Sequence, residues 1–395
     1  MTNMHSSSFG WRVVAIIALF AYFFPSLRPV FKYFGAYAGF LLVGYIAVVL
    51  AFLWIRSRLP RDGRVAQIFE NLLLGAAVLL AVFVVVTFVY PLADGLWSVG
   101  RGSDHDDCVI LGVQQLVQGA FPYSVRTYIG NACSTGPGVF VFAAPFVVVG
   151  AYEYLNVAAL VLCSLVLRTR YGTAFSQTWL LILVGSLVFM ELTSVGSDLI
   201  FLSLLTLTVC VGLDASRVQA RIAPVVVAAI VCGLIGAARM NFIVIPFVIG
   251  ALVFSADRRM FMVFTGVGLG VALVLWLGFF AWDPALFSPY QVVQRSQRLA
   301  PFWVLAAGGL VSMCLFFASV YLVRRSKFGV PVFYLVSMLP MFLVVAVGEL
   351  GVRGWDLSLW EGANFIAPLF PFAAYALTEL VLGPVRSVSG SQTVA

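Results

Sequence analysis

Apolar positions run along most of this chain in unbroken stretches, and short polar turns separate one stretch from the next. Residues 34–55, 70–90 and 259–280 are clear examples. Each is long enough to cross the hydrocarbon core of a bilayer, which takes roughly 17–25 residues as a helix. The pattern predicts an all-α, polytopic transmembrane protein of about 12 crossings (11–13). The predicted spans are 11–25, 34–55, 70–90, 138–168, 178–192, 198–213, 222–238, 241–256, 259–280, 301–323, 330–349 and 363–382.

Composition supports the same class. Of the 395 residues, 62% are hydrophobic and only 10% are charged, and the mean hydropathy is +1.06. A soluble domain carries about a quarter of its residues as charged side chains, so composition excludes a soluble fold. The first apolar segment begins at Trp11 and lacks a small-residue cleavage site, so we expect it to remain as a span. We therefore predict one transmembrane domain over residues 1–395, in the plasma (inner) membrane.

The distribution of charge predicts the orientation in the membrane. We place the N-terminus inside and take 138–168 as one net crossing that contains a re-entrant or half-length piece. Fifteen of the 23 basic residues then fall on the cytoplasmic side, as the positive-inside rule requires. We predict that both termini are cytoplasmic and that 387–395 is a short cytoplasmic tail. Ten of the sixteen acids fall outside instead, which indicates either a polar working surface there or loops that need charge for hydration.

The longest polar connection covers residues 91–137 and is predicted to be extracytoplasmic. Three of its acids lie close together, at Asp104, Asp106 and Asp107. Apolar residues then recur along one side of the segment that follows, which predicts an amphipathic juxtamembrane helix near 106–119, lying in the interface. Asp104 is well placed to cap that helix. Capping needs one acid, or two, so three exceed the requirement.

The stretch "SDHDDCVILGVQQLVQGAFPYSVRTYIGNACSTGPGVFVFAAPFVVVG" resembles the GT-C superfamily of integral-membrane glycosyltransferases, most closely the bacterial mannosyltransferase-like branch, family 87. "GSDLIFLSLL" (196–205) and "GAARMNFIVIPFV" (236–248) add weaker similarity, and the motifs cover about a fifth of the chain. The acids fit the D-x-D or the D-D-x form of that superfamily. The resemblance implies a GT-C-like fold, a polyprenyl-phosphate sugar donor and an inverting reaction. In many GT-C enzymes this loop follows the first span, whereas here three predicted spans precede it.

Inverting transfer needs a base for the acceptor hydroxyl, and a carboxylate can serve as that base. Asp104 or Asp106 is the candidate base, and Asp107 would orient the helix or the acceptor. Acids this close repel one another, so one of them would have a raised pKa or share a divalent cation such as Mg²⁺ or Mn²⁺. Asp104 and Asp106 are the candidate metal ligands, while metal use by this chain stays open. His105 could also ligate a metal or be only a polar loop residue.

Arginine suits the departing phosphate because its planar guanidinium can pair two oxygens at once. Arg239 lies between two predicted spans with almost no loop, so it is either a phosphate ligand, assisted by Asn241, or a side chain that snorkels to lipid headgroups. The further substrate-binding candidates are Arg126, Arg298, Tyr123 and Gln115. Asp198 closes the turn "ELTSVGSD", where it would cap the following helix or, as the alternative, make a polar contact to the sugar.

Cys108 and Cys133 both fall in the outer loop, where an oxidising compartment would allow a disulfide; two free thiols are the alternative. The chain has no metal-type cysteine spacing and no glycine-rich nucleotide loop after a strand, so a nucleotide-sugar donor is not expected.

The leading hypothesis is a glycosyltransferase that works at the outer face of the membrane, with a mannose-like or pentose donor. Its expected partners are a lipid-linked sugar donor, a lipid or glycan acceptor and membrane lipids, with no nucleic acid. The alternative is a transporter or flippase, which would place ionisable residues near the bilayer midplane and show internal repeats. A third hypothesis is a non-enzymatic membrane scaffold, which would leave the acid cluster and Arg239 unexplained.

Overall fold

The computed structural model describes residues 5–59, 64–95, 104, 106–213, 222–290 and 301–383. It is 80% helix, and those ranges contain no strand, so the predicted all-α class is confirmed. One isolated bridge pairs Arg126 with Ala132. The chain forms two compact units that alternate along the sequence: unit 1 is Met1–Ala81, Val161–Glu191 and Leu299–Ala395, and unit 2 is Val82–Leu160 and Leu192–Arg298.

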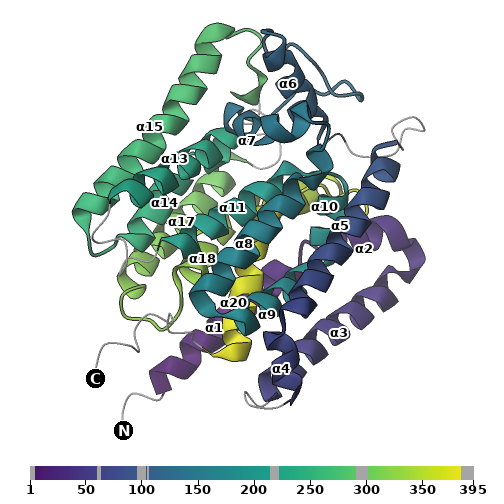
Figure 1. Ribbon diagram of the computed structural model, residues 1–395, viewed down its shortest axis with the longest axis vertical. Helices are drawn as coiled ribbons and strands as arrows, with labels where there is room; N and C mark the ends of the chain where they lie inside the picture. Colours follow the sequence, from purple (N-terminus) through teal and green to yellow (C-terminus); the bar gives the residue numbers. More distant parts are fainter. Residues whose placement is uncertain are drawn as a thin grey trace. The chain divides into compact units, whose positions relative to one another are not determined.

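Unit 1 is built around its C-terminal helix. Its helices are α1 (His5–Phe23), α2 (Leu27–Phe34), α3 (Ala38–Arg58), α4 (Arg64–Glu70), α9 (Thr173–Val184), α17 (Phe302–Leu322), α18 (Val330–Val352), α19 (Ala363–Ile366) and α20 (Phe370–Leu382). Helix α20 packs on α1, α9 and α18, as its position in Figure 1 shows. The indole of Trp179 donates to the carbonyl of Pro371 (3.1 Å), and the ring of Tyr22 stacks on Phe370. Aromatic side chains therefore fill this core.

Unit 2 holds the loop that the sequence analysis singles out. Its helices are α6 (Asp107–Val117), α7 (Pro137–Val148), α11 (Asp198–Gly212), α13 (Ile222–Ala238), α14 (Ile245–Val253) and α15 (Arg258–Trp282), while α5 (Leu72–Gly95), α8 (Leu155–Tyr171) and α10 (Leu187–Ser194) have residues in both units. Helix α13 packs on α7, α11 and α15. A Cβ at Gly233 would lie 2.5 Å from the carbonyl oxygen of Gly268 on α15, so small residues let these helices approach closely.

By length and hydropathy, the described helices contain seven candidate membrane spans, or eight if α9 and α10, bent by 76°, form one span. The candidates are Gly10–Arg58, Leu72–Gly95, Tyr152–Tyr171, Arg258–Trp282, Phe302–Leu322, Val330–Val352 and Ala363–Leu382. The predicted count of about 12 is not confirmed. Three predicted spans, 198–213, 222–238 and 241–256, coincide with helices too short for that criterion. An apolar run alone does not separate a span from a buried helix, since both are hydrophobic all round.

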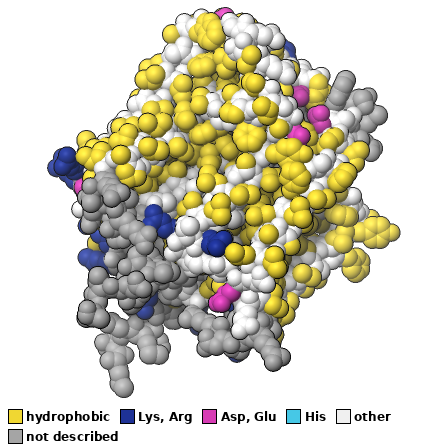
Figure 2. Space-filling view, in the orientation of Figure 1, with side chains coloured by type: hydrophobic (Ala, Val, Ile, Leu, Met, Phe, Trp, Pro, Cys, Tyr) yellow, Lys and Arg dark blue, Asp and Glu magenta, His cyan; other side chains and the backbone are white. Residues whose placement is uncertain are grey.

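Hydrophobic side chains cover much of the visible surface (Figure 2). Exposed examples in the candidate spans are Phe40, which is 86% exposed, and Phe88, which is 68% exposed. Soluble monomers rarely expose large contiguous apolar patches. The apolar surface and the long apolar helices together indicate a membrane protein.

Candidate functional site

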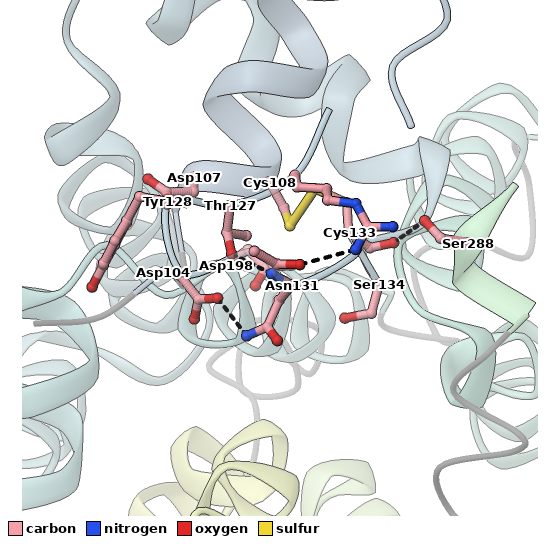
Figure 3. The surroundings of a disulfide bond; sticks show 12 residues. Asp104, Asp107, Cys108, Thr127, Tyr128, Asn131, Cys133, Ser134, Asp198 and Ser288 are labelled. Carbon is pink, nitrogen blue, oxygen red and sulfur yellow. Dashed lines mark hydrogen bonds between the residues drawn. A yellow bond between two sulfur atoms is a disulfide. The ribbon is translucent and has the colours of Figure 1, made fainter. Parts of the chain in front are cut away.

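The three loop acids lie at the start of α6, where each contacts a different partner. Helix α6 begins at Asp107, within the predicted range 106–119, and Asp106 takes the N-cap position without a side-chain capping bond. Oδ2 of Asp106 accepts a hydrogen bond from the hydroxyl of Tyr90 on α5. Oδ2 of Asp104 accepts from the amide of Asn131 at 3.0 Å (Figure 3). The predicted capping role of Asp104 is therefore wrong, because the helix starts later and Asp104 binds a loop residue instead.

A fourth acid joins the cluster from α5. Asp94 follows Tyr90 by four residues, so one face of α5 carries both. Carboxylate oxygens of Asp94, Asp106 and Asp107 lie within 4.8 Å of one another. Three carboxylates are a donor set that suits Mg²⁺ or Mn²⁺. The predicted ligand pair was Asp104 and Asp106, whereas the structure groups Asp106 with Asp94 and Asp107.

Asp106 is a buried acid with a perturbed pKa. Only 2% of it is exposed, and this burial raises the pKa of its carboxyl to about 7. The negative charges of Asp94 and Asp107 raise that pKa further, while the hydrogen bond from Tyr90 opposes the shift. Burial also raises the pKa of Asp107, against the backbone N–H of Tyr128, which donates to its Oδ2 at 3.1 Å. A group that titrates near neutral pH is matched to proton transfer under those conditions.

A glycine turn forms the wall behind Asp106. Gly196 has a φ of +66°, in the left-handed region that favours glycine. A Cβ at this position would lie 2.7 Å from the ring of Tyr90 and 3.2 Å from Cβ of Asp106. The hydroxyl of Tyr152 donates to the carbonyl of Gly196 at 2.9 Å, which holds the turn in place. Sequence reasoning missed Tyr90, Tyr152 and Gly196 because their contacts join segments far apart in the chain.

Arg239 and Asp198 form a bidentate ion pair inside unit 2. Nε of Arg239 donates to Oδ2 of Asp198 at 3.1 Å, and Nη2 donates to Oδ1 at 2.5 Å. Asp198 is fully buried, and the side chain of Arg239 is 19% exposed. The capping explanation for Asp198 is wrong, because Ser197 holds the N-cap position of α11 and both oxygens of Asp198 bind Arg239. The guanidinium of Arg239 is thus held by protein groups.

A disulfide joins the acids to the arginine side of the loop. Cys108, directly after Asp107, pairs with Cys133, and their Cα atoms are 5.2 Å apart. Ser134, the residue after Cys133, accepts from Nη1 of Arg239 at 3.4 Å. The hydroxyl of Ser288 donates to the carbonyl of Cys133 (Figure 3). The Cys108–Cys133 disulfide therefore links the start of α6 to the segment that holds Ser134, which contacts Arg239.

The other predicted binding residues are less closely tied to the acids. Tyr123 is buried, and its hydroxyl has no hydrogen-bond partner in the described part of the chain. Burial raises the pKa of Tyr123, and the charge of nearby Arg239 opposes that shift. Arg126 donates to the carbonyl of Gly130 at 3.1 Å. Gln115 is half-buried on α6, and Asn241 is exposed in the 3-10 turn Met240–Phe242.

Three predictions fall on residues that the structure does not describe: Arg298, His105 and the tail 387–395. Within the described residues, the structure brings Asp94, Asp106 and Asp107 together and builds a second polar centre at Arg239. Both centres belong to unit 2. Comparison of the chain with models of known protein families, with curated proteins and with solved structures found no match.

Proposed function

We propose that this chain is a GT-C-type glycosyltransferase. It transfers a mannose-like or pentose sugar from a polyprenyl-phosphate donor to a cell-envelope lipid or glycan acceptor, with inversion. The observation that carries the proposal is Asp106, a buried carboxyl whose pKa is raised to about 7 and which Tyr90 holds in one orientation. A carboxyl that titrates near neutral pH and is held in one orientation is matched to general-base catalysis.

Asp106 is the base in this mechanism. Tyr90 occupies Oδ2, so Oδ1 is the oxygen that receives the proton of the acceptor hydroxyl. The acceptor oxygen forms a bond to the anomeric carbon of the donor sugar as the bond from that carbon to the phosphate oxygen breaks. The phosphate leaves on the lipid with the electron pair of the broken bond. Asp104 accepts a hydrogen bond from Asn131, and Asp107 accepts one from the backbone N–H of Tyr128. We assign to both acids the role of positioning the acceptor.

Arg239 serves the donor phosphate. Asp198 takes its Nε and Nη2, while the longer contact from Nη1 to Ser134, at 3.4 Å, is the one that a phosphate oxygen would replace. The unpartnered hydroxyl of Tyr123 lies within the field of Arg239 and supplies a second donor to the same anion. Hydrogen bonds from charged donors to phosphate are about twice as strong as neutral ones.

A divalent cation fits the acid cluster as well. Asp94, Asp106 and Asp107 would hold it, each with one oxygen. Bound there, the cation would neutralise the carboxylates and polarise an oxygen of a ligand. The base role of Asp106 applies to the cation-free cluster, because a cation on its carboxylate would occupy the oxygen that receives the proton and would lower its pKa.

The disulfide supports an extracytoplasmic position for the site. Disulfides form and persist in oxidising compartments, so the segment between Cys108 and Cys133 is expected on the outer side. The positive-inside bias of the basic residues supports the same orientation, with both termini cytoplasmic. We retain the arrangement of about 12 crossings as part of this proposal.

Sugar transfer by the purified protein in lipid nanodiscs tests the function directly. A panel of polyprenyl-phosphate sugars and cell-envelope lipid acceptors should yield one productive pair. Asp106→Asn should lower transfer by at least about 100-fold, the usual contribution of a general base. The matched control is Asp283→Asn, a half-buried acid of the same unit that accepts hydrogen bonds from the backbone N–H groups of Ala285 and Leu286. Full activity after Asp104, Asp106 and Asp107 are all changed to Asn would refute the catalytic assignment.

A further inference from the structure

Helices α9 and α10 are apolar and long enough to cross a membrane only when they are taken together, and they are bent by 76° at the break between them. The break lies at Gly185 and Ser186, within unit 1. A bend of this size interrupts the regular helical hydrogen bonds, so backbone groups at the break need other partners. In a membrane protein, hydroxyl side chains of neighbouring helices and ordered water take that role.

Two buried hydroxyls contact the helix ends at this break. The hydroxyl of Tyr22 on α1 donates to the carbonyl of Ile182, near the end of α9, at 2.7 Å. Oγ of Ser186 accepts from the backbone N–H of Phe189, in the first turn of α10, at 3.4 Å. Tyr22 and Ser186 are both fully buried. Hydroxyl oxygens therefore lie on both sides of the break.

A third hydroxyl lies at the break without a hydrogen bond. The hydroxyl of Tyr45 on α3 is buried and lies near three others, which belong to Tyr22, Ser26 and Ser186. None of these oxygens, and no other group in the described ranges, meets it with the distance and angle of a hydrogen bond. Ser26, also fully buried, donates instead to the carbonyl of Tyr22 at 3.4 Å. Because a buried hydroxyl without a partner destabilises a protein, this arrangement indicates a small ligand that bridges the hydroxyls.

Hydrogen-bonding capacity and charge favour water as that ligand. A water molecule donates two bonds and accepts two, so it can accept from Tyr45 and donate to the oxygens of Tyr22 and Ser186. A cation is disfavoured, because the backbone N–H of Leu187 also lies beside Tyr45 and the start of α10 carries the positive end of the helix dipole. An anion would lose its hydration among aromatic rings, since Tyr22 stacks on both Tyr45 and Phe370.

We propose that an internal water molecule is bound at the break between α9 and α10, held by the hydroxyls of Tyr22, Tyr45 and Ser186. The water joins α1 and α3 to the point where the span is broken, and it thereby stabilises the bend. The site belongs to unit 1, whereas the acid cluster and Arg239 belong to unit 2, so the inference does not depend on the proposed function.

X-ray radiolytic footprinting of the full-length protein in nanodiscs tests for the water directly. Radiolysis of a bound water oxidises the side chain beside it, even where bulk solvent has no access. Tyr22 should therefore be labelled although it is fully buried, and Tyr45→Phe should remove most of this label. Phe372 is the internal control that should stay unlabelled, because it is equally buried and stacks on Tyr334.

Thermal unfolding in nanodiscs tests the same site by the sign of a shift. If water satisfies the Tyr45 hydroxyl, Tyr45→Phe removes a hydrogen bond and should lower the thermal midpoint by about 2 °C. If the hydroxyl is unpaired in a dry interior, the same change removes an unsatisfied group and should raise the midpoint. Ser186→Ala should lower the midpoint as well. Tyr37→Phe is the matched control and should leave it unchanged, because Tyr37 is an exposed tyrosine of the same unit.

A labelled Tyr22 that loses its label in Tyr45→Phe, together with a lowered midpoint, supports the water site. An unlabelled Tyr22, a label that persists in Tyr45→Phe, or a midpoint that is raised or unchanged in that variant overturns it. Replacing sodium chloride by choline gluconate at constant ionic strength tests for an ion. A midpoint that falls in the unmodified protein but not in Tyr45→Phe would assign the site to an ion and overturn the assignment to water.

Discussion

The hydroxyl of Tyr90 donates a hydrogen bond to Oδ2 of Asp106, and this contact joins the end of α5 to the start of α6. It is formed by two residues of low exposure, 9% for Tyr90 and 2% for Asp106. The bond stabilises the ionised carboxylate and so opposes the effect of burial on its pKa. Orientation and acidity of the proposed base therefore depend on the same hydroxyl.

Tyr90→Phe should raise the pKa of Asp106 above about 7, because it removes the hydrogen bond that lowers that pKa. The acid limb of the pH profile of kcat/KM should move to higher pH. Activity at neutral pH should fall about two- to five-fold, as expected for a shift of about half to one pKa unit, and recover in more alkaline buffer. Tyr154→Phe is the control, since the Tyr154 hydroxyl pairs with Thr87 on the same α5 helix. An unshifted profile in Tyr90→Phe would argue against Asp106 as the base.

The stability of the protein should fall as pH rises from about 4 to about 7. The unfolded chain loses the Asp106 proton near pH 4, whereas the folded chain keeps it until about pH 7, so the folded state binds more protons in this window. Asp106→Asn removes this penalty and should raise the thermal midpoint at about pH 8 more than at about pH 5. Thermal unfolding in nanodiscs measures both values, with Asp283→Asn as the control. An equal change at both pH values would contradict the raised pKa.

Gly196→Ala should destabilise the protein and reduce transfer activity. The left-handed backbone costs about 1 kcal/mol for alanine, and the added Cβ would also collide with the ring of Tyr90. Gly150→Ala is the matched control, because Gly150 has a similar φ of +69° with nothing within 4 Å of its Cβ position. Chemical denaturation of both variants separates the two effects. Equal losses of stability would mean that backbone strain alone accounts for Gly196.

Alkylation of denatured protein should label two more cysteines with reductant than without it. Without reductant, only the cysteines outside the disulfide should react, because Cys108 and Cys133 are bonded to each other; they are Cys163, Cys210, Cys232 and Cys314. Intact mass gives the count directly. Reduction should also lower the stability by about 2–4 kcal/mol, the usual contribution of such a bridge. Labelling of Cys108 and Cys133 in unreduced protein extracted from the membrane would contradict the pairing.

The number of crossings shows that an apolar pattern predicts helices more reliably than it predicts membrane spans. Residues 198–213 and 222–238 are as apolar as a true span, and both form helices in the structure. Both helices are too short to count as candidate spans, and α11 is buried along most of its length. Hydropathy measures how apolar a segment is, and lipid and a protein interior satisfy an apolar segment equally well.

The sequence by itself determined the helical membrane class, the segment that carries the acid cluster and the short helix that follows its acids. These are local properties, since apolar run length and helical period are written in neighbouring residues. Tertiary structure decided that Asp94 joins the cluster, that Tyr90 holds Asp106 and that Arg239 is paired with Asp198. The Tyr90–Asp106 contact spans 16 residues and the Arg239–Asp198 contact spans 41. No local pattern encodes such contacts, because burial and hydrogen bonding depend on which helices pack together.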